Sequence, residues 1–393
     1  MSRKVLISLL GRAEKRDGVY RTTCYKFPDG SLSEPTAFLG WELFNRTCPD
    51  AMILIGTQGS MWAWLHADSL GSGAPPLSTE ELERLLPLNE AVANQRVTQQ
   101  LLDQSTPTLK QALGCDVHPI LISDCQTTAE QHDLLLRLAP FIEQGDSLTL
   151  DLTHSFRHHS LLLMMASVYL RSVRSASIAA MYTSFYDSDT GLGTVFDLEG
   201  LHALLEWQDA LSSFRKDGDP GVFAPLLEAD HASPEAVREL SRASYFSRVF
   251  RHESAWKAER TVANQLERHR PSGISGLYVP ELIAQLGQRD GAQTSVRLAE
   301  LARRQLELGS YDRAVLLGLA AAQAKNVQGD ESLDDVHYRL TQTDPNPDYV
   351  LLNGIRNSIA HTSHSAQRQD AEKALKGKEI LIDKLTSLFK HLI

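Results

Sequence analysis

The first half of the chain alternates short apolar runs with segments of helical periodicity. Runs rich in Ile, Leu and Val occur at Lys4–Leu10, Ala51–Gly56, Val117–Ser123, Ser147–Leu152 and Ala176–Thr183. Between them, apolar residues at helical spacing predict helices near Thr36–Arg46, Glu80–Leu113, Thr127–Glu143 and Phe156–Arg171. Strands that alternate with helices favour a mainly parallel sheet covered on both faces. We therefore expect a Rossmann-like, doubly wound α/β domain over residues 1–200, closed by a β-hairpin near Asp187–Asp197.

After Gly200 the pattern becomes helical and no convincing strand pattern follows. Periodic segments occur at Leu201–Phe214, Pro234–Arg270, Gln293–Leu308, Tyr311–Val327, Tyr349–His361 and Asp370–Ile393. Lys216–Pro220 and Gln328–Pro347 carry Gly, Asp and Pro and are predicted to be loops. The sequence thus predicts a second, all-α domain over residues 201–393.

Composition narrows the classes of function. The chain is 42% hydrophobic and 22% charged, as soluble globular proteins are, and its formal net charge is −10. A net negative charge argues against coating a nucleic-acid duplex or a membrane surface. A stretch of Arg, Lys and His from Arg238 to Arg270 is interleaved with Glu residues, so we interpret it as a solvated helical face, with an RNA-guiding surface as the alternative.

The cysteines and the N-terminal segment indicate the cellular compartment of the protein. The four cysteines form no CxxC pair, so we expect neither a disulfide framework nor a zinc site, and a reducing compartment fits. The apolar run near the N-terminus ends at Gly11 and charged residues, which favours a first strand over a secretion signal. No apolar stretch approaches the ~20 residues that a membrane span requires. We expect a cytoplasmic protein without metal or cofactor.

One turn of the last-but-one helical segment carries candidate catalytic residues. Asn357 and His361 are four residues apart and so share a helical face, with Arg356 beside them. Histidine can transfer the proton of a ribose 2′-hydroxyl near neutral pH, and arginine can stabilise charge on the attacked phosphate. This combination suits metal-independent RNA cleavage. The alternative is a solvated face with a hydrogen-bonded histidine.

At these residues the sequence resembles the HEPN ribonuclease domain, whose signature is Arg, a polar residue, several others and His. The segment YDRAVLLGLAAAQA from Tyr311 looks like the helix that packs against the motif helix in that family. The resemblance implies that Arg356 and His361 are catalytic and that Asn357 supports them. It also implies a composite site formed by two copies of the motif across the axis of a homodimer.

Three loops follow predicted strands in the first half, where open α/β sheets bind ligands. In chain order, the first loop is Gly11–Arg12, the second is Gly56–Trp62 and the third is Asp151–Arg157. Thr153 or Ser155 is predicted to cap the helix that begins near Phe156, whose N-terminus favours phosphate. The candidate ligand-binding residues are Gly11, Arg12, Thr57, Gln58, Gly59, Ser60, Met61, Trp62, Thr153, His154, Ser155, Phe156 and Arg157. The alternative is that the hydroxyl groups only cap helices and the aromatic residues belong to the core.

Together these loops resemble the CARF sensor domain of CRISPR-associated ancillary nucleases of type III systems, in a CARF–HEPN arrangement. The stretch LLEW from Leu204 resembles the family's junction helix, and Ser155 stands where the family usually has Gly. The resemblance implies a cyclic oligoadenylate as allosteric activator, single-stranded RNA as substrate and a role in antiviral defence. The GxGxxG fingerprint of dinucleotide enzymes is absent. Two alternatives stay open: a ligand-responsive binding module with a silent helical domain, and a sensor that also degrades its ligand through Thr153 or Ser60.

Overall fold

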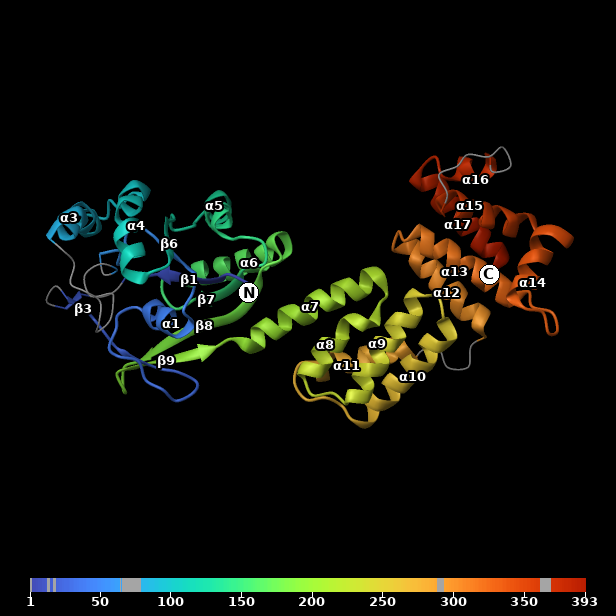
Figure 1. Cartoon of the computed structure of the whole chain (residues 1–393), viewed down its shortest axis with the longest axis horizontal. Coiled ribbons are helices and arrows are strands. Elements are labelled where there is room, and N and C mark those ends of the chain that lie inside the picture. Colours follow the sequence, from blue (N-terminus) through green and yellow to red (C-terminus); the bar gives the residue numbers. More distant parts are fainter. Residues whose placement is uncertain are drawn as a thin grey trace. The chain divides into compact units, whose positions relative to one another are not determined.

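The computed structural model describes residues 2–12, 15–16, 19–63, 65, 79–287, 293–360 and 369–393 (Figure 1). The chain forms two compact units, Met1–Ala203 and Leu204–Ile393. The first is an α/β unit and the second is helical, so the predicted fold class is confirmed.

A seven-stranded sheet forms the centre of the N-terminal unit, in the order β4-β9-β8-β7-β1-β5-β6. Its strands are β1 (Lys4–Leu10), β4 (Cys24–Lys26), β5 (Ala51–Gly56), β6 (Asp116–Leu121), β7 (Ser147–Asp151), β8 (Ser177–Asp187) and β9 (Leu192–Asp197). Neighbouring strands are parallel except β8 and β9, which form the expected hairpin and lead into α7 (Figure 1). The short strands β2 (Lys15–Arg16) and β3 (Val19–Tyr20) pair separately.

Alternate side chains of the central strands bury themselves on opposite faces of the sheet. Val5, Ile7 and Leu9 of β1 join one core, while Leu6 and Leu10 join the other. Helices α5 (Thr128–Leu138) and α6 (Arg157–Arg174) cover the first face. The second face carries α1 (Leu39–Thr47), α3 (Thr79–Ala93) and α4 (Gln99–Leu113). Burial on both faces explains why these strands are continuous apolar runs rather than alternating ones.

Two features of this unit were not predicted. The segment Glu80–Leu113 is not one helix but two, because Gln95 has a left-handed backbone (φ 52°) and Thr98 caps the start of α4. Strand β4 is too short to show a pattern and exists because it pairs with β9.

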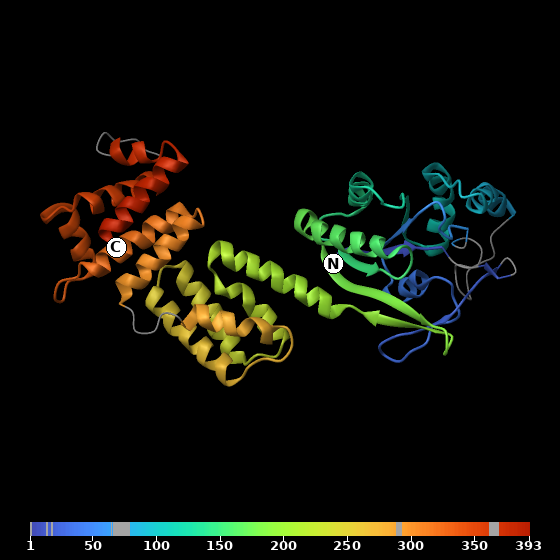
Figure 2. The same ribbon diagram turned by 180° about the vertical axis from the view of Figure 1, so that it is seen from behind.

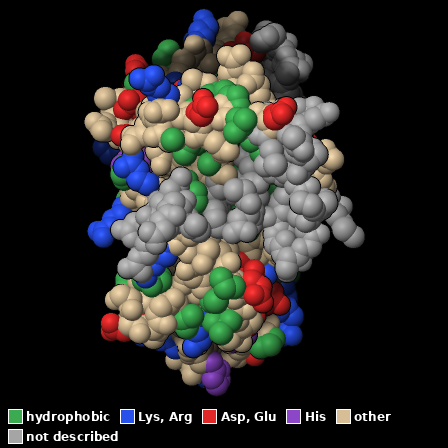
Figure 3. All heavy atoms as spheres, turned by 90° about the vertical axis from the view of Figure 1, so that its left-hand side faces the viewer, with side chains coloured by type: hydrophobic (Ala, Val, Ile, Leu, Met, Phe, Trp, Pro, Cys, Tyr) green, Lys and Arg blue, Asp and Glu red, His purple; other side chains and the backbone are tan. Residues whose placement is uncertain are grey.

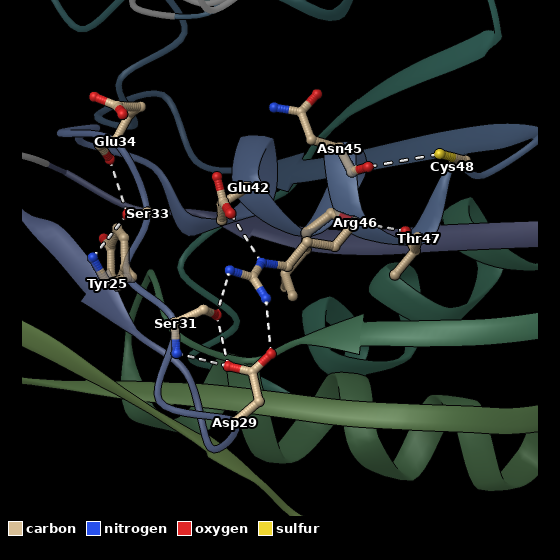
Figure 4. Close-up of polar contacts among 11 residues, drawn as sticks. Tyr25, Asp29, Ser31, Ser33, Glu34, Glu42, Asn45, Arg46, Thr47 and Cys48 are labelled. Carbon is tan, nitrogen blue, oxygen red and sulfur yellow. Dashed lines mark hydrogen bonds and ion pairs between the residues drawn. The ribbon is translucent and has the colours of Figure 1, made fainter.

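The turn after β4 is fastened to α1 by one arginine (Figure 4). Arg46 donates hydrogen bonds to Glu42 and to the Ser31 hydroxyl, each at 2.8 Å, and forms an ion pair with Asp29 at 3.5 Å. Its guanidinium also lies 3.5 Å from the centroid of the Phe27 ring. These contacts hold the turn at the edge of the sheet against α1.

The helical unit contains eleven named helices among the described residues. They are α7 (Glu199–Asp217), which crosses the division between the units, α8 (Ala224–Ala229), α9 (Pro234–Arg248), α10 (His252–Arg268), α11 (Ser275–Gly287), α12 (Thr294–Glu307), α13 (Tyr311–Lys325), α14 (Leu333–Tyr338), α15 (Pro347–Ala360), α16 (Gln369–Ala374) and α17 (Lys378–Leu392). One core forms around Trp207 and Phe223, and another joins α12 and α13, which lie side by side in both views, to α15 and α17 (Figures 1 and 2).

Two predictions for this unit were wrong. The expected long helix Pro234–Arg270 is a packed pair, α9 and α10, because the chain turns at Phe250, whose backbone is left-handed (φ 57°). The predicted loop Gln328–Pro347 contains α14, which Ser332 and Asp335 cap reciprocally, and a π-helical turn at Arg339–Thr343. Among the described residues, none of the helices combines the length and the apolar character that a membrane crossing requires.

Candidate functional site

A cleft of about 1050 Å³ opens at the carboxyl ends of β1, β5, β6 and β7. The chain places β5 and β6 on one side of β1 and then crosses to β7 on its other side, so the cleft lies at the topological switch point, where α/β sheets bind ligands. The predicted residues that line it are Gly11, Arg12, Thr57, Gln58, Gly59, Ser60, Ser155 and Phe156. The structure thus brings together residues from all three predicted loops.

The three loops interlock through close backbone contacts. A Cβ atom on Gly11 would lie 2.6 Å from the backbone nitrogen of Ser155, so the first and third loops touch. The backbone N–H of Met61 donates to the Gly11 carbonyl at 2.9 Å, and the Ser60 hydroxyl donates to the Leu10 carbonyl at 2.5 Å. Only glycine at position 11 permits this packing.

Arg12 is the cation that the cleft leaves available. Its guanidinium lies over Gly59, where a Cβ atom would be 2.5 Å from a guanidinium nitrogen. Within the described residues Arg12 has no hydrogen-bond or ion-pair partner, whereas Arg137 across the cleft pairs with Asp133 at 2.5 Å. Cationic and anionic side chains intermingle on the described part of the end face of this unit (Figure 3). Recognition of an anion here must therefore be local, and Arg12 is placed for it.

Ser155 is held by a buried histidine. Its hydroxyl oxygen lies 2.7 Å from Nδ1 of His159, whose side chain is 0% exposed, and burial lowers the pKa of that imidazole. The prediction that Thr153 or Ser155 caps α6 was wrong: the N-cap is Phe156, and no side chain caps the helix in the described structure. Because Ser155 bonds to His159 instead, the first-turn N–H groups of α6 receive no hydroxyl.

Other predicted residues support the loops from below. Asp151 is buried and accepts hydrogen bonds from the Ser8 hydroxyl at 2.5 Å and from the backbone of Thr153 at 3.0 Å. Nε2 of His154 accepts from the backbone of Leu39 at 3.3 Å, and burial lowers the pKa of this imidazole. Thr153 and His154 therefore position the third loop and do not line the cleft.

Three further predicted residues also lie outside the cleft, and part of the cleft wall was not predicted from the sequence. Met61 and Trp62 are buried in the core beneath the second loop, and Arg157 is exposed at the start of α6. The unpredicted wall consists of Gln95, the loop after β6 and one side of α5, with Glu130, Asp133 and Arg137. The rule that pointed to the other loops, position after a parallel strand, would have found the β6 loop as well.

The second candidate site lies on α15. Tyr349, Leu352 and Ile355 bury one side of this helix, and Arg356 and Asn357 are half-buried beside it. The Tyr349 hydroxyl lies 2.7 Å from Nδ1 of His337; burial raises the pKa of Tyr349, and the positive charge of Arg356 opposes that rise. Arg356 thus lies close enough to the buried Tyr349, which contacts the half-buried His337, for its charge to act on that tyrosine.

His361, the third predicted catalytic residue, lies outside the described residues. Helix α13, predicted to pack against the motif helix, does so through Ala314, Leu317 and Ala321, which share a core with Leu352 and Ile355. Within the described parts of the chain, no three His, Cys, Asp or Glu side chains converge as a metal-binding group would.

Comparison with known proteins gives one distant relationship. No protein-family model matches the chain. A CRISPR-associated protein of Methanocaldococcus jannaschii is 25% identical over 267 residues, which cover 61% of this chain. The chain spans about 40% of the length of that relative. The similarity supports a relationship to CRISPR-associated proteins.

Proposed function

We propose that this protein is a metal-independent endoribonuclease, activated by a cyclic oligoadenylate, that cleaves single-stranded RNA in type III CRISPR antiviral defence. The observation that carries the proposal is the presence in one chain of a switch-point cleft, where Arg12 has no partner among the described residues, and of a helix that presents Arg356 and Asn357 together. The distant CRISPR-associated relative supports the same setting.

The proposed cleavage uses the RNA's own ribose as nucleophile. His361 and its copy in a second protomer take the proton of the 2′-hydroxyl and return one to the departing 5′-oxygen. Arg356 stabilises the charge that develops on the phosphate, and Asn357 orients these groups. The products are a 2′,3′-cyclic phosphate and a 5′-hydroxyl, and the step consumes no metal or cofactor.

A second copy of the chain is proposed to dock on α6. Leu161, Met165, Tyr169 and Val173 recur every fourth residue along this helix and are all exposed. The row starts at Leu161, five residues after Phe156, which is exposed and lines the cleft. Pairing of two α6 helices about a two-fold axis places two clefts side by side, as a symmetric ring ligand requires.

Activation requires that the ring bind the active dimer more tightly than the resting one. A differential of about 1–3 kcal/mol, the usual scale of allosteric coupling, shifts the ratio of active to resting dimer about 5- to 150-fold. In the cleft, Arg12 and the first turn of α6 take the phosphates, and the hydroxyl and amide groups of Thr57 and Gln58 contact the bases or riboses.

The deciding experiment measures cleavage of a labelled single-stranded RNA with EDTA present, with and without cyclic oligoadenylates. We expect ligand-dependent cleavage by the unsubstituted chain and its loss, by at least 100-fold, in Arg356→Ala and in His361→Ala. Cleavage that persists in both variants would remove the α15 residues from the mechanism. Ligand binding without cleavage under any condition would instead favour a regulatory module with a silent helical unit.

One observation favours a second activity in the same chain, degradation of the ligand. Ser155 lines the cleft, and its hydroxyl oxygen lies 2.7 Å from Nδ1 of the buried His159, which in one tautomer accepts the serine proton. Thr153 lies outside the cleft and the Ser60 hydroxyl bonds to the Leu10 carbonyl, so Ser155 is better placed than either of the residues that the sequence suggested. Incubation of labelled ring with Arg356→Ala and with Arg356→Ala/Ser155→Gly tests this activity: loss of ring cleavage only in the second supports it.

A further inference from the structure

The outward face of α9 combines arginine and aromatic side chains. Arg238, Arg242 and Tyr245 of α9 and Val249, the residue that ends the helix, follow one another at helical spacing, so they line one face over about 16 Å. The side chains of Arg238 and Arg242 are 66% and 56% exposed, and Tyr245 is 61% exposed. We call these four residues, with Phe246 beside them, the α9 face.

The groups on this face are held in place. One guanidinium nitrogen of Arg242 lies 2.8 and 3.0 Å from the two carboxylate oxygens of Glu239, and the guanidinium lies 5.7 Å from the centroid of the Phe246 ring. Phe246 in turn meets Tyr245 edge to face, with ring centroids 5.5 Å apart. The face is therefore ordered before any partner binds, which reduces the entropy lost on binding.

Charge on this part of the chain opposes the charge of the whole. Between Pro234 and Arg270 there are eight Lys and Arg residues and five Glu residues, a balance of +3 in a chain whose net charge is −10. Glu239 forms ion pairs with both arginines of the α9 face, at 3.7 Å to Arg238 and 2.8 Å to Arg242, so one carboxylate is shared by two cations and a net positive charge remains. A merely solvated helical face accounts for the arginines, but it does not account for the exposed Tyr245 and Val249 that follow them on the same face.

We propose that the α9 face binds single-stranded RNA. A base stacks on the exposed ring of Tyr245, and the flanking phosphates meet Arg238 and Arg242. Single strands fit better than a duplex because paired bases keep their faces covered by their neighbours and cannot reach the tyrosine. The proposal deepens the proposed function by naming how the substrate is held, and it rests on that function only for the fate of the RNA.

The test measures affinity for a fluorescein-labelled 12-nucleotide oligouridylate by anisotropy, with the full chain carrying Arg356→Ala so that no RNA is cleaved. We expect Tyr245→Ala to weaken binding roughly tenfold, because base–aromatic stacking contributes on that scale, and Tyr245→Phe to bind within about twofold of its parent. Arg238→Ala should lower the slope of log affinity against log salt by about 0.7, the value for one phosphate contact. Arg268→Ala is the matched control: it removes an equal charge from the exposed end of α10 and should leave the slope unchanged.

Three results overturn the proposal, two from binding and assembly and a third from the kinetics of cleavage. One is an affinity for oligouridylate that Tyr245→Ala leaves within twofold of its parent. The other is a change in sedimentation of Tyr245→Ala without a change in RNA affinity, which would make the α9 face a protein interface. Failure of the proposed function gives a distinguishable result. In that case the unsubstituted chain cleaves no RNA under any condition, while its affinity for oligouridylate still depends on Tyr245. A third result also overturns the α9 proposal: Arg356→Ala abolishes RNA cleavage, but Tyr245→Ala has the KM of the unsubstituted chain. That result supports the proposed nuclease and excludes RNA binding by the α9 face.

Discussion

The hydroxyl oxygen of Ser155 lies 2.7 Å from Nδ1 of His159, across one turn of the start of α6. Ser155 has a backbone φ of 88°, in the left-handed region that favours glycine. Such a conformation costs about 1–3 kcal/mol in a residue other than glycine, and the hydrogen bond to a buried imidazole offsets part of that cost. The pair therefore keeps a serine at a wall of the cleft where backbone geometry alone would select glycine.

Substitutions at Ser155 should separate two contributions to the free energy of unfolding: the strain of the left-handed backbone and the hydrogen bond to His159. Ser155→Ala keeps the strained backbone and leaves His159 without its partner, so we expect a loss of about 1–3 kcal/mol in the free energy of unfolding. Ser155→Gly loses the same bond but relieves the strain, and should stay within about 1 kcal/mol of the unsubstituted protein. Urea unfolding measures both. Equal losses in the two variants would show that the left-handed backbone carries no strain.

The buried histidines predict sensitivity to mild acid. Burial lowers the pKa values of His154 and His159 in the folded state, so below about pH 6.5 the unfolded chain takes up protons that the folded chain does not. The stability that these histidines contribute is complete above about pH 6.5 and declines as the pH falls toward their lowered folded-state values. Thermal unfolding between pH 7.5 and 5.5 should show a falling Tm. The fall should be shallower in His159→Gln, whereas the exposed His132→Gln should keep the original slope.

Gly11 should tolerate no side chain. A Cβ atom there meets the backbone nitrogen of Ser155 at 2.6 Å, and backbone cannot move aside as a flexible side chain can. We expect Gly11→Ala to lower the free energy of unfolding by about 1–3 kcal/mol and to weaken ring binding at least tenfold. Gly200→Ala is the control, since a Cβ atom there meets nothing within 4 Å. Calorimetric titration that finds unaltered affinity in Gly11→Ala would argue against contact between the first and third loops.

The exposed row on α6 predicts where the dimer forms. A carboxylate introduced by Met165→Glu or Tyr169→Glu would lie buried and unpaired in an α6–α6 interface, so sedimentation should show a shift from dimer to monomer. Both side chains are exposed in the single chain, so circular dichroism should stay unchanged. Leu277→Glu, on the exposed side of α11, provides a control that leaves assembly intact. Dimers that persist in both α6 variants would place the interface elsewhere.

Much of this protein follows from local pattern. Runs such as Lys4–Leu10 and Ala51–Gly56 have the bounds that the sequence predicted, because strands buried on both faces must be apolar throughout. The change to helical spacing after Gly200 likewise predicted the helical unit. Loops after parallel strands were expected to meet at one edge of the sheet, and Gly11, Thr57 and Ser155 do so. Spacing alone also put Arg356 and Asn357 on one turn of helix.

Tertiary structure decided what periodicity cannot express. The sequence left open whether Trp62 contacts a ligand or packs in the core. In the folded chain, Trp62 is part of the hydrophobic core on one face of the sheet. The turn at Phe250 has the composition of a helix, yet packing of α10 against α9 requires the chain to reverse there. The contact between Ser155 and His159 needs the left-handed backbone that the third loop adopts. Local sequence sets which faces are apolar, but long-range packing determines which of those faces meet.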